Sequence, residues 1–269
     1  MKKLFYIIMC VILLVSCCIP VSATTLSNYS LSLETQIVNH SKLVCQAYGT
    51  SLTSDEENEL RLGIREIATT YAKDNSCTLN SAYNAILSEM LIETPLESIS
   101  VDIGMNVRSS SGNGTVQLPS ATAGYIFFTD NDKPYNHVGM YTSSDTIIEA
   151  MPDPGVHEVS VTDSTALQEC TGDSHDQSCI LSVDGANAND ISSAITWTRN
   201  YIGCDYDNSF LSNKKNTTSQ NEEFNCSELV WKAYRFGAPS NLDLDSNGGF
   251  AVYPNNIYNS DLTIHQTDF

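Results

Sequence analysis

The sequence is poor in positive charge: 13 Lys and Arg stand against 32 Asp and Glu, a formal net charge of −19 over 269 residues. Proteins bind nucleic acid by letting Lys and Arg replace counterions along the phosphate chain, so this composition argues against a nucleic-acid partner. An anionic membrane surface would repel the chain for the same reason. Proline and glycine are also scarce, at 8 and 14 residues, and the hydrophobic fraction is an ordinary 41%. These values exclude a disordered or collagen-like chain and indicate a folded globular protein.

Several common catalytic motifs are missing from the sequence. It contains no His-Glu-x-x-His, no phosphate-binding loop and no Gly-x-Ser-x-Gly elbow. The segment from Asp243 to Gly248 begins like a calcium-binding loop, but Pro254 occupies the position where such a loop needs a bidentate Glu. We therefore expect neither a metal ion nor a cofactor.

The amino terminus has the pattern of an export signal. Lys2 and Lys3 precede an apolar stretch from Leu4 to Val15, and small residues follow. The stretch is too short to span a bilayer. Two outcomes are open: cleavage after Ala23, which makes residues 1–23 a signal peptide, or lipid attachment at Cys17, where the sequence resembles a bacterial lipobox. In both cases we expect a secreted or cell-envelope protein.

Export changes the expected state of the cysteines, because an oxidising compartment favours disulfides over free thiols. Cleavage after Ala23 would leave six of the nine cysteines. A local disulfide between Cys45 and Cys77 is the economical prediction for the amino-terminal region. A second one between Cys170 and Cys179, which bracket a polar loop, is favoured over a zinc site at the same place.

Two regions differ in their hydrophobic period. Residues 24–115 are predicted to form a helical region followed by a linker, with a capping box from Ser54 to Glu57 and a turn-rich junction from Ser109 to Gly114. Apolar residues recur at helical spacing in three stripes along this region. The stripes indicate helices that pack on one another rather than a catalytic centre. They are Leu33, Ile37, Val44 and Tyr48; Leu60, Ile64, Ile67 and Tyr71; and Leu79, Tyr83, Ile86 and Met90.

Residues 116–269 change to short β-type runs and then return to helical patterns. Helices are predicted over residues 190–202 and immediately after Cys226, where apolar residues recur on one face. This order predicts an α+β fold in which helices pack on a small antiparallel sheet. The β-type runs are Gly124 to Phe128, His137 to Tyr141, Thr146 to Ala150 and Val156 to Val161.

One pair of strands brings a histidine and a glutamate together. If Tyr141 pairs with Asp145 around a turn at Ser143, His137 lies directly across from Glu149 on the same face. A carboxylate beside an imidazole raises its basicity and fixes its tautomer, as a general base requires. A purely structural hydrogen bond is the alternative. The remaining histidines are expected to be ordinary surface or packing residues: His40, His157, His175 and His265.

Cys226 stands where a polar segment changes to a helical stripe, so its thiol is predicted at a helix amino terminus. Exposed backbone amides there favour the thiolate, whereas the neighbouring carboxylates of Glu222, Glu223 and Glu228 oppose it. We expect the helix and a contacting imidazolium to prevail, since exposed carboxylates are screened by salt. The alternative is a disulfide between Cys226 and Cys204.

Taken together, these motifs resemble the YiiX-like group of permuted papain-fold peptidases and amidases, relatives of the NlpC cell-wall amidases and of lecithin retinol acyltransferase. The resemblance covers roughly residues 120–260 and implies a permuted papain-like domain at 116–269, in which the catalytic His precedes the Cys. It implies Cys226 as the nucleophile, His137 as the base and Glu149 as the residue that orients the base. The motifs are Gly124 to Phe128, His137 to Tyr141, Ile148 to Ala150, Tyr206 to Asp207 and Cys226 to Tyr234.

The resemblance implies a function as well. Together with export, it predicts a cysteine hydrolase that cleaves an amide bond in a peptidoglycan stem peptide or a related peptide through a thioester. An acyl-lipid hydrolase or acyltransferase is the second reading. A third, from a different class, is a non-catalytic module that binds a ligand in the same groove.

Overall fold

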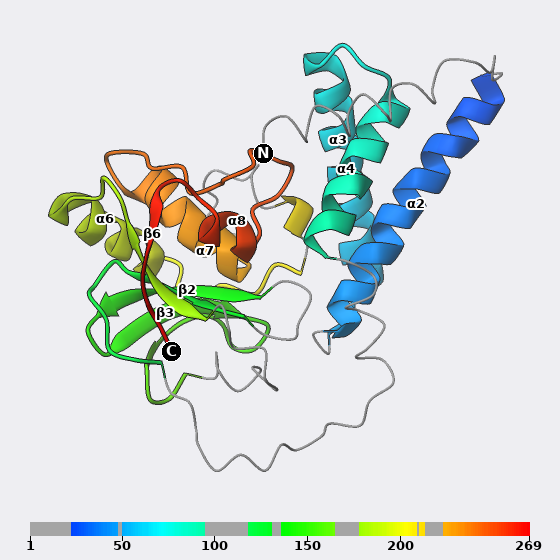
Figure 1. Cartoon of the computed structure of the whole chain (residues 1–269). Coiled ribbons are helices and arrows are strands. Elements are labelled where there is room, and N and C mark those ends of the chain that lie inside the picture. Colours follow the sequence, from blue (N-terminus) through cyan, green and yellow to red (C-terminus); the bar gives the residue numbers. More distant parts are fainter. Residues whose placement is uncertain are drawn as a thin grey trace.

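The computed structural model contains a helical unit beside a sheet covered by helices (Figure 1). The predicted signal, apart from Ala23, lies outside the described residues, as do the Ser109 to Gly114 junction, Cys170 and His175. No helix within the described part of the chain is long and apolar enough to cross a membrane. The structure describes residues 23–47, 50–94, 118–130, 136–164, 178–208, 210–212 and 223–269, with side chains from residue 30 onward.

The helical unit consists of α2 (Ala23–Ala47), α3 (Ser54–Asp74) and α4 (Leu79–Glu93). One residue from each predicted stripe, Ile37, Ile64 and Ile86, is fully buried in their shared core. The capping box begins one residue earlier than predicted. Thr53 Oγ1 accepts the Glu56 N–H, and the Glu56 side chain accepts the Thr53 N–H at 2.6 Å. The sequence thus predicted the helices, while the cap was misplaced by one position.

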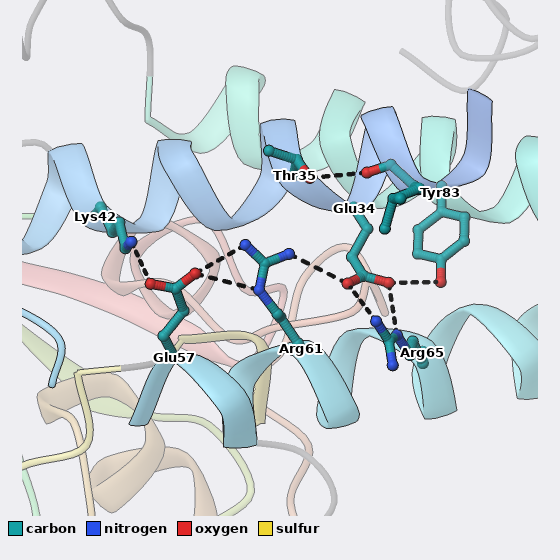
Figure 2. Close-up of polar contacts among 8 residues, drawn as sticks. Glu34, Thr35, Lys42, Glu57, Arg61, Arg65 and Tyr83 are labelled. Atoms are coloured by element: carbon teal, nitrogen blue, oxygen red, sulfur yellow. Dashed lines mark hydrogen bonds and ion pairs between the residues drawn. The ribbon is translucent and has the colours of Figure 1, made fainter. Parts of the chain in front are cut away.

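A buried carboxylate joins α2 to α3 (Figure 2). Glu34 is only 3% exposed, and its oxygens accept hydrogen bonds from Arg65 Nε at 2.7 Å and Arg61 Nη1 at 3.2 Å. Arg61 also binds Glu57, which pairs with Lys42. Burial raises the pKa of Glu34, but the bonds from Arg65 and Arg61 outweigh burial and lower it. The ion pairs therefore hold the helices in one register.

The sheet is antiparallel and has the strand order β4-β3-β2-β1-β5-β6. Its first four strands coincide with the four predicted β-type runs, and the α+β prediction is confirmed. The last two strands were not predicted. The strands are β1 (Ile126–Thr129), β2 (His137–Ser143), β3 (Thr146–Met151), β4 (Gly155–Ser160), β5 (Cys179–Val183) and β6 (Thr263–Asp268).

Helices cover the sheet and complete its core. Figure 1 shows α7 above the strands, and its residues pack with β2 and β3. The chain continues from α7 through a π-helical turn, which packs on α6. The helices are α6 (Ala188–Arg199), α7 (Cys226–Lys232) with the π-helical turn Ala233–Gly237, and α8 (Pro254–Tyr258).

The register of β2 and β3 differs from the prediction. Tyr141 pairs with Ile147, whereas Asp145 was the expected partner. The prediction is wrong by two residues because Asp145 lies in the hairpin turn itself. Side chains alternate between the faces of a strand, so a shift of two preserves the face of each residue. His137 and Glu149 are therefore not directly opposite each other, but they remain on one side of the sheet.

The helical unit docks onto the loop before α8. The carboxylate of Glu89 accepts the backbone N–H groups of Phe250, at 2.7 Å, and Ala251, at 3.1 Å. Glu93 Oε1 accepts a hydrogen bond from Asn256 Nδ2 at 3.2 Å. The two parts of the chain are therefore joined by partly buried polar contacts between α4 and this part of the chain.

The segment that resembles a calcium loop takes part in this structure instead. Asp243 Oδ1 accepts the Trp231 indole N–H at 2.8 Å, and Asn247 Nδ2 donates to Glu93 Oε1 at 3.3 Å. Within the described residues, no group of three His, Cys, Asp or Glu side chains is arranged to hold a metal ion. The segment from Asp243 to Gly248 therefore connects α7 to α4 through these two hydrogen bonds.

The predicted disulfide between Cys45 and Cys77 is not formed, since both are free thiols. Cys45 lies near the start of α3 and Cys77 just beyond its end, and a helix of 21 residues is about 31 Å long. The Cys45 thiol contacts the Asn208 carbonyl instead. The prediction was wrong because it treated residues of one region as neighbours without the helix between them.

The buried Glu34 cluster generates a stability prediction. Glu34→Gln should lower the free energy of unfolding at pH 7 by about 1–3 kcal/mol, the usual range for a charged hydrogen bond. Because the pKa of Glu34 is lowered on folding, its contribution is present above the unfolded value of about 4.5 and is lost as pH falls through the folded value. Urea unfolding at several pH values measures both effects.

The matched control is Glu59→Gln, which changes an exposed carboxylate on α3. It should alter stability by less than about 0.5 kcal/mol. Equal stability of the Glu34 variant and the unmodified protein at pH 7 would contradict the proposed role of the cluster.

Candidate active site

His137 begins β2, in the middle of the sheet, and is 6% exposed. Its ring lies beside that of Phe127, with centroids 5.5 Å apart. Its Nε2 is 2.8 Å from Oε2 of Glu149, a fully buried residue on β3. The sheet therefore holds an imidazole against a carboxylate, as the sequence predicted, although the register that achieves this differs.

Cys226 is the first residue of α7 and is 2% exposed. The preceding residue, Asn225, caps the helix, and its Oδ1 accepts the Glu228 N–H at 2.9 Å. Ser227 Oγ donates to the Val252 carbonyl at 2.6 Å, so residues on both sides of the cysteine are fixed. Cys226 is a free thiol, which overturns the alternative of a disulfide with Cys204.

The structure brings these three residues together from β2, β3 and α7. Cys226 lies close enough to His137 to affect the pKa of its imidazole, and His137 Nε2 also hydrogen-bonds Glu149. The imidazole thus lies between a thiol and a carboxylate. Since Nε2 faces Glu149, the other ring nitrogen, Nδ1, remains for the thiol.

Residues 121–244, which contain this cluster, match the family described as permuted papain-like amidase enzymes of the YaeF/YiiX type, C92 family. This part of the chain is similar to that family. The resemblance stated from the sequence is confirmed. The matched residues begin before β1 and end after the π-helical turn, so they do not include α2, α3 or α4.

A curated relative matches a longer stretch of the chain. The chain is 32% identical over 163 residues to the uncharacterized protein YycO of Bacillus subtilis (strain 168). The match covers 60% of this chain and 61% of YycO, so it spans about three fifths of that relative. No solved structure matches the chain.

Burial and charge act in opposite directions on the pKa values of His137 and Glu149. Burial lowers the pKa of His137, but Cys226 and Glu149 outweigh it and raise the value to about 10. Burial likewise raises the pKa of Glu149, whereas His137 and His157 lower it to about 2. The site therefore favours a protonated His137 beside an ionised Glu149 over a wide range of pH.

One carboxylate expected to oppose the thiolate is neutralised. Glu228 pairs with Lys232 on the same helix, with Nζ and Oε1 2.7 Å apart, and both side chains are buried. The Lys232 ammonium also lies 5.3 Å from the centroid of the Phe224 ring. Glu228 was expected to place a negative charge near Cys226, but Lys232, four residues later, balances it. This spacing is the usual signal for an ion pair on a helix.

The histidines treated as ordinary have different roles. His40 is buried, with Nε2 2.5 Å from Thr94 Oγ1, and His265 is exposed beside Asp268, which agrees with the expectation. His157 differs from the expectation of an ordinary surface or packing residue, because it pairs across the sheet with Glu149. Its Nε2 lies 3.4 Å from Glu149 Oε1. Extending the hairpin from β3 into β4 would have placed it beside the carboxylate.

The geometry predicts a reactive thiol. Iodoacetamide should label Cys226 well below pH 8.5, and His137→Ala should slow the reaction at pH 7 by at least about tenfold, because the thiolate then loses its imidazolium. Peptide-resolved mass spectrometry of unreduced protein measures the rate at each cysteine.

Cys45 is the internal control, since burial raises its pKa to about 11 and it should remain unlabelled at pH 7. Far-ultraviolet circular dichroism checks that the His137 variant is folded. Labelling of Cys226 at the same rate with and without His137 would contradict the predicted activation.

Proposed function

We propose that the protein is an exported cysteine hydrolase that cleaves an amide bond through a thioester. Cys226 acts as the nucleophile, His137 as the general base and then the general acid, and Glu149 orients the imidazole. One observation supports the proposal: His137 Nε2 lies 2.8 Å from Glu149 Oε2, and Cys226 is near enough to His137 to raise the pKa of its imidazole. The family description as amidases supports the same class of reaction.

The first half of the reaction forms the acyl-enzyme. His137 takes the proton of Cys226, and the sulfur attacks the substrate carbonyl carbon while the carbonyl electron pair moves onto oxygen. Collapse of this oxyanion breaks the C–N bond, and the imidazolium donates its proton to the departing amine. Glu149, held as a carboxylate, stabilises the imidazolium that exists between these steps.

The second half releases the acid. His137 removes a proton from water as the water attacks the thioester carbonyl, and collapse of the second oxyanion breaks the C–S bond and restores the thiol. The backbone amides at the start of α7, including that of Cys226, are the proposed oxyanion donors. Asn225 adds a further donor, because its buried Nδ2 has no hydrogen-bond partner within the described residues.

The proposed substrate is an amide in a peptidoglycan stem peptide or in a related peptide. The family description as amidases supports an amide bond, and the predicted export signal supports a substrate outside the cytoplasm. A net charge of −19 gives no attraction to an anionic wall polymer, so recognition must come from local contacts around the site. The second candidate is an acyl ester of a lipid, which the same thiol chemistry would cleave.

Substrate comparison tests the proposal. The full chain, expressed with its own leader, should release amine from muropeptides, and Cys226→Ala should lower kcat by at least about a thousandfold because the nucleophile is removed. Mass spectrometry after rapid acid quenching should detect an acyl group on Cys226 that hydroxylamine removes.

The other readings give different results in this assay. Cleavage of acyl esters without muropeptide cleavage would support the lipid hydrolase instead. A Cys226 that labels as slowly as Cys45, together with no turnover of either substrate, would support the binding module.

Export is tested separately by mass spectrometry of the protein produced in a bacterium. We expect a mature chain that begins at Thr24 or one that carries a lipid on Cys17. Recovery of the chain with Met1 and the complete leader from such cells would contradict export.

A further inference from the structure

Glu149 contacts more than the proposed base. Its Oε2 bonds His137, while its Oε1 accepts a hydrogen bond from Ser164 Oγ at 3.1 Å and lies 3.4 Å from His157 Nε2. His157 is on β4, directly paired with Glu149 on β3, and its side chain is 21% exposed. The carboxylate is thus held on one oxygen by His137 and on the other by two residues that the proposed mechanism leaves unused.

The surroundings of His157 define its protonation state. Its Nδ1 lies 2.9 Å from the Gly155 carbonyl, which only accepts hydrogen bonds, so Nδ1 must carry a proton to make this contact. Its Nε2 faces a carboxylate, which also only accepts when ionised. A neutral imidazole has one N–H and cannot donate to both groups. His157 satisfies both contacts only as an imidazolium.

We propose that His157 is a positioning residue, an imidazolium that joins the Gly155 carbonyl to Glu149 Oε1 and so fixes the carboxylate that orients His137. This inference rests on the proposed function of Cys226, His137 and Glu149. With Oε1 held from β4, the carboxyl group cannot turn away from His137 without breaking the contacts to His157 and Ser164. The base is therefore aligned by two strands rather than one.

The charges around His157 agree with this role. The charged groups that act on it are Glu149, on β3, and His137, on β2 beyond the same carboxylate. The hydrogen bond to Glu149 raises the pKa of His157, against the effect of burial, and the positive charge of His137 lowers it to a smaller extent. The carboxylate thus lies between two imidazoles, and each stabilises its ionised form.

The experiment compares His157→Gln with His157→Lys in the full chain. Gln keeps a side-chain donor without positive charge, whereas Lys keeps the charge. Loss of a positive charge disfavours anions nearby, so the midpoint of Cys226 alkylation against pH should rise by about half to one pH unit in His157→Gln. Amide hydrolysis should show kcat reduced about tenfold with little change in KM, because the residue does not touch substrate. His157→Lys should restore most of both.

The matched control is His265→Gln, which removes a histidine that is also paired with a carboxylate, Asp268, on β6. It should leave the alkylation midpoint and kcat unchanged. A His157→Gln variant with unchanged midpoint and unchanged kcat would overturn the proposal while leaving the proposed function intact. Loss of activity without a change in midpoint in both His157 variants would indicate a merely structural residue and would also overturn it.

A spectroscopic measurement tests the proposal even if the thiol is unreactive. Nitrogen NMR of the histidine rings should show both nitrogens of His157 protonated at pH 7, and Glu149→Gln should convert His157 to the neutral form at that pH. A neutral His157 at pH 7 in the unmodified protein would overturn the inference. An unreactive Cys226 with a charged His157 would instead remove the proposed function.

Discussion

A buried negative charge at Glu149 sets the requirement that the rest of the site satisfies. An ionised carboxylate in a protein interior is costly unless cations and hydrogen bonds compensate it. Here the donors come from β2, from β4 and from the residues that follow β4. Only a sheet in which β3 lies between β2 and β4 brings both histidines to this one residue. The ionised state of Glu149 thus depends on the strand order, which brings both histidines to it.

The helix that carries the thiol also contains a buried carboxylate that needs a compensating cation. Cys226 lies on α7, where the charge of Glu228 is balanced within the helix by Lys232. If that glutamate were unpaired, it would oppose a thiolate in the first turn of the helix. Of the carboxylates expected to oppose the thiolate, Glu228 is thus balanced by a cation on its own helix.

Much of the site was predictable because it depends on local patterns. The period of two identified the first four strands, and the change to a helical period placed Cys226 at a helix start. The shared face of His137 and Glu149 was predicted correctly in spite of a register error, since an even shift leaves every side chain on its own face. The helical stripes of residues 24–115 likewise predicted a common core.

Long-range pairing limited the remaining predictions. β5 and β6 are separated by about eighty residues of chain, and no local signal links Cys179 to the carboxyl-terminal strand. His157 was overlooked because a single histidine in a strand carries no motif until its partner across the sheet is known. The Cys45 and Cys77 prediction failed because proximity in sequence was taken for proximity across a helix.

The docking of α4 has a consequence for how the chain can be divided. Glu89 binds the backbone of Phe250 and Ala251, and the next residue, Val252, accepts the hydroxyl of Ser227 beside Cys226. A fragment that began at the sheet would leave these amides without their acceptor and would uncover apolar side chains that now face the helices. A cut near residue 121, where the family match begins, would therefore remove the contacts by which α4 supports the segment that holds Ser227 beside Cys226.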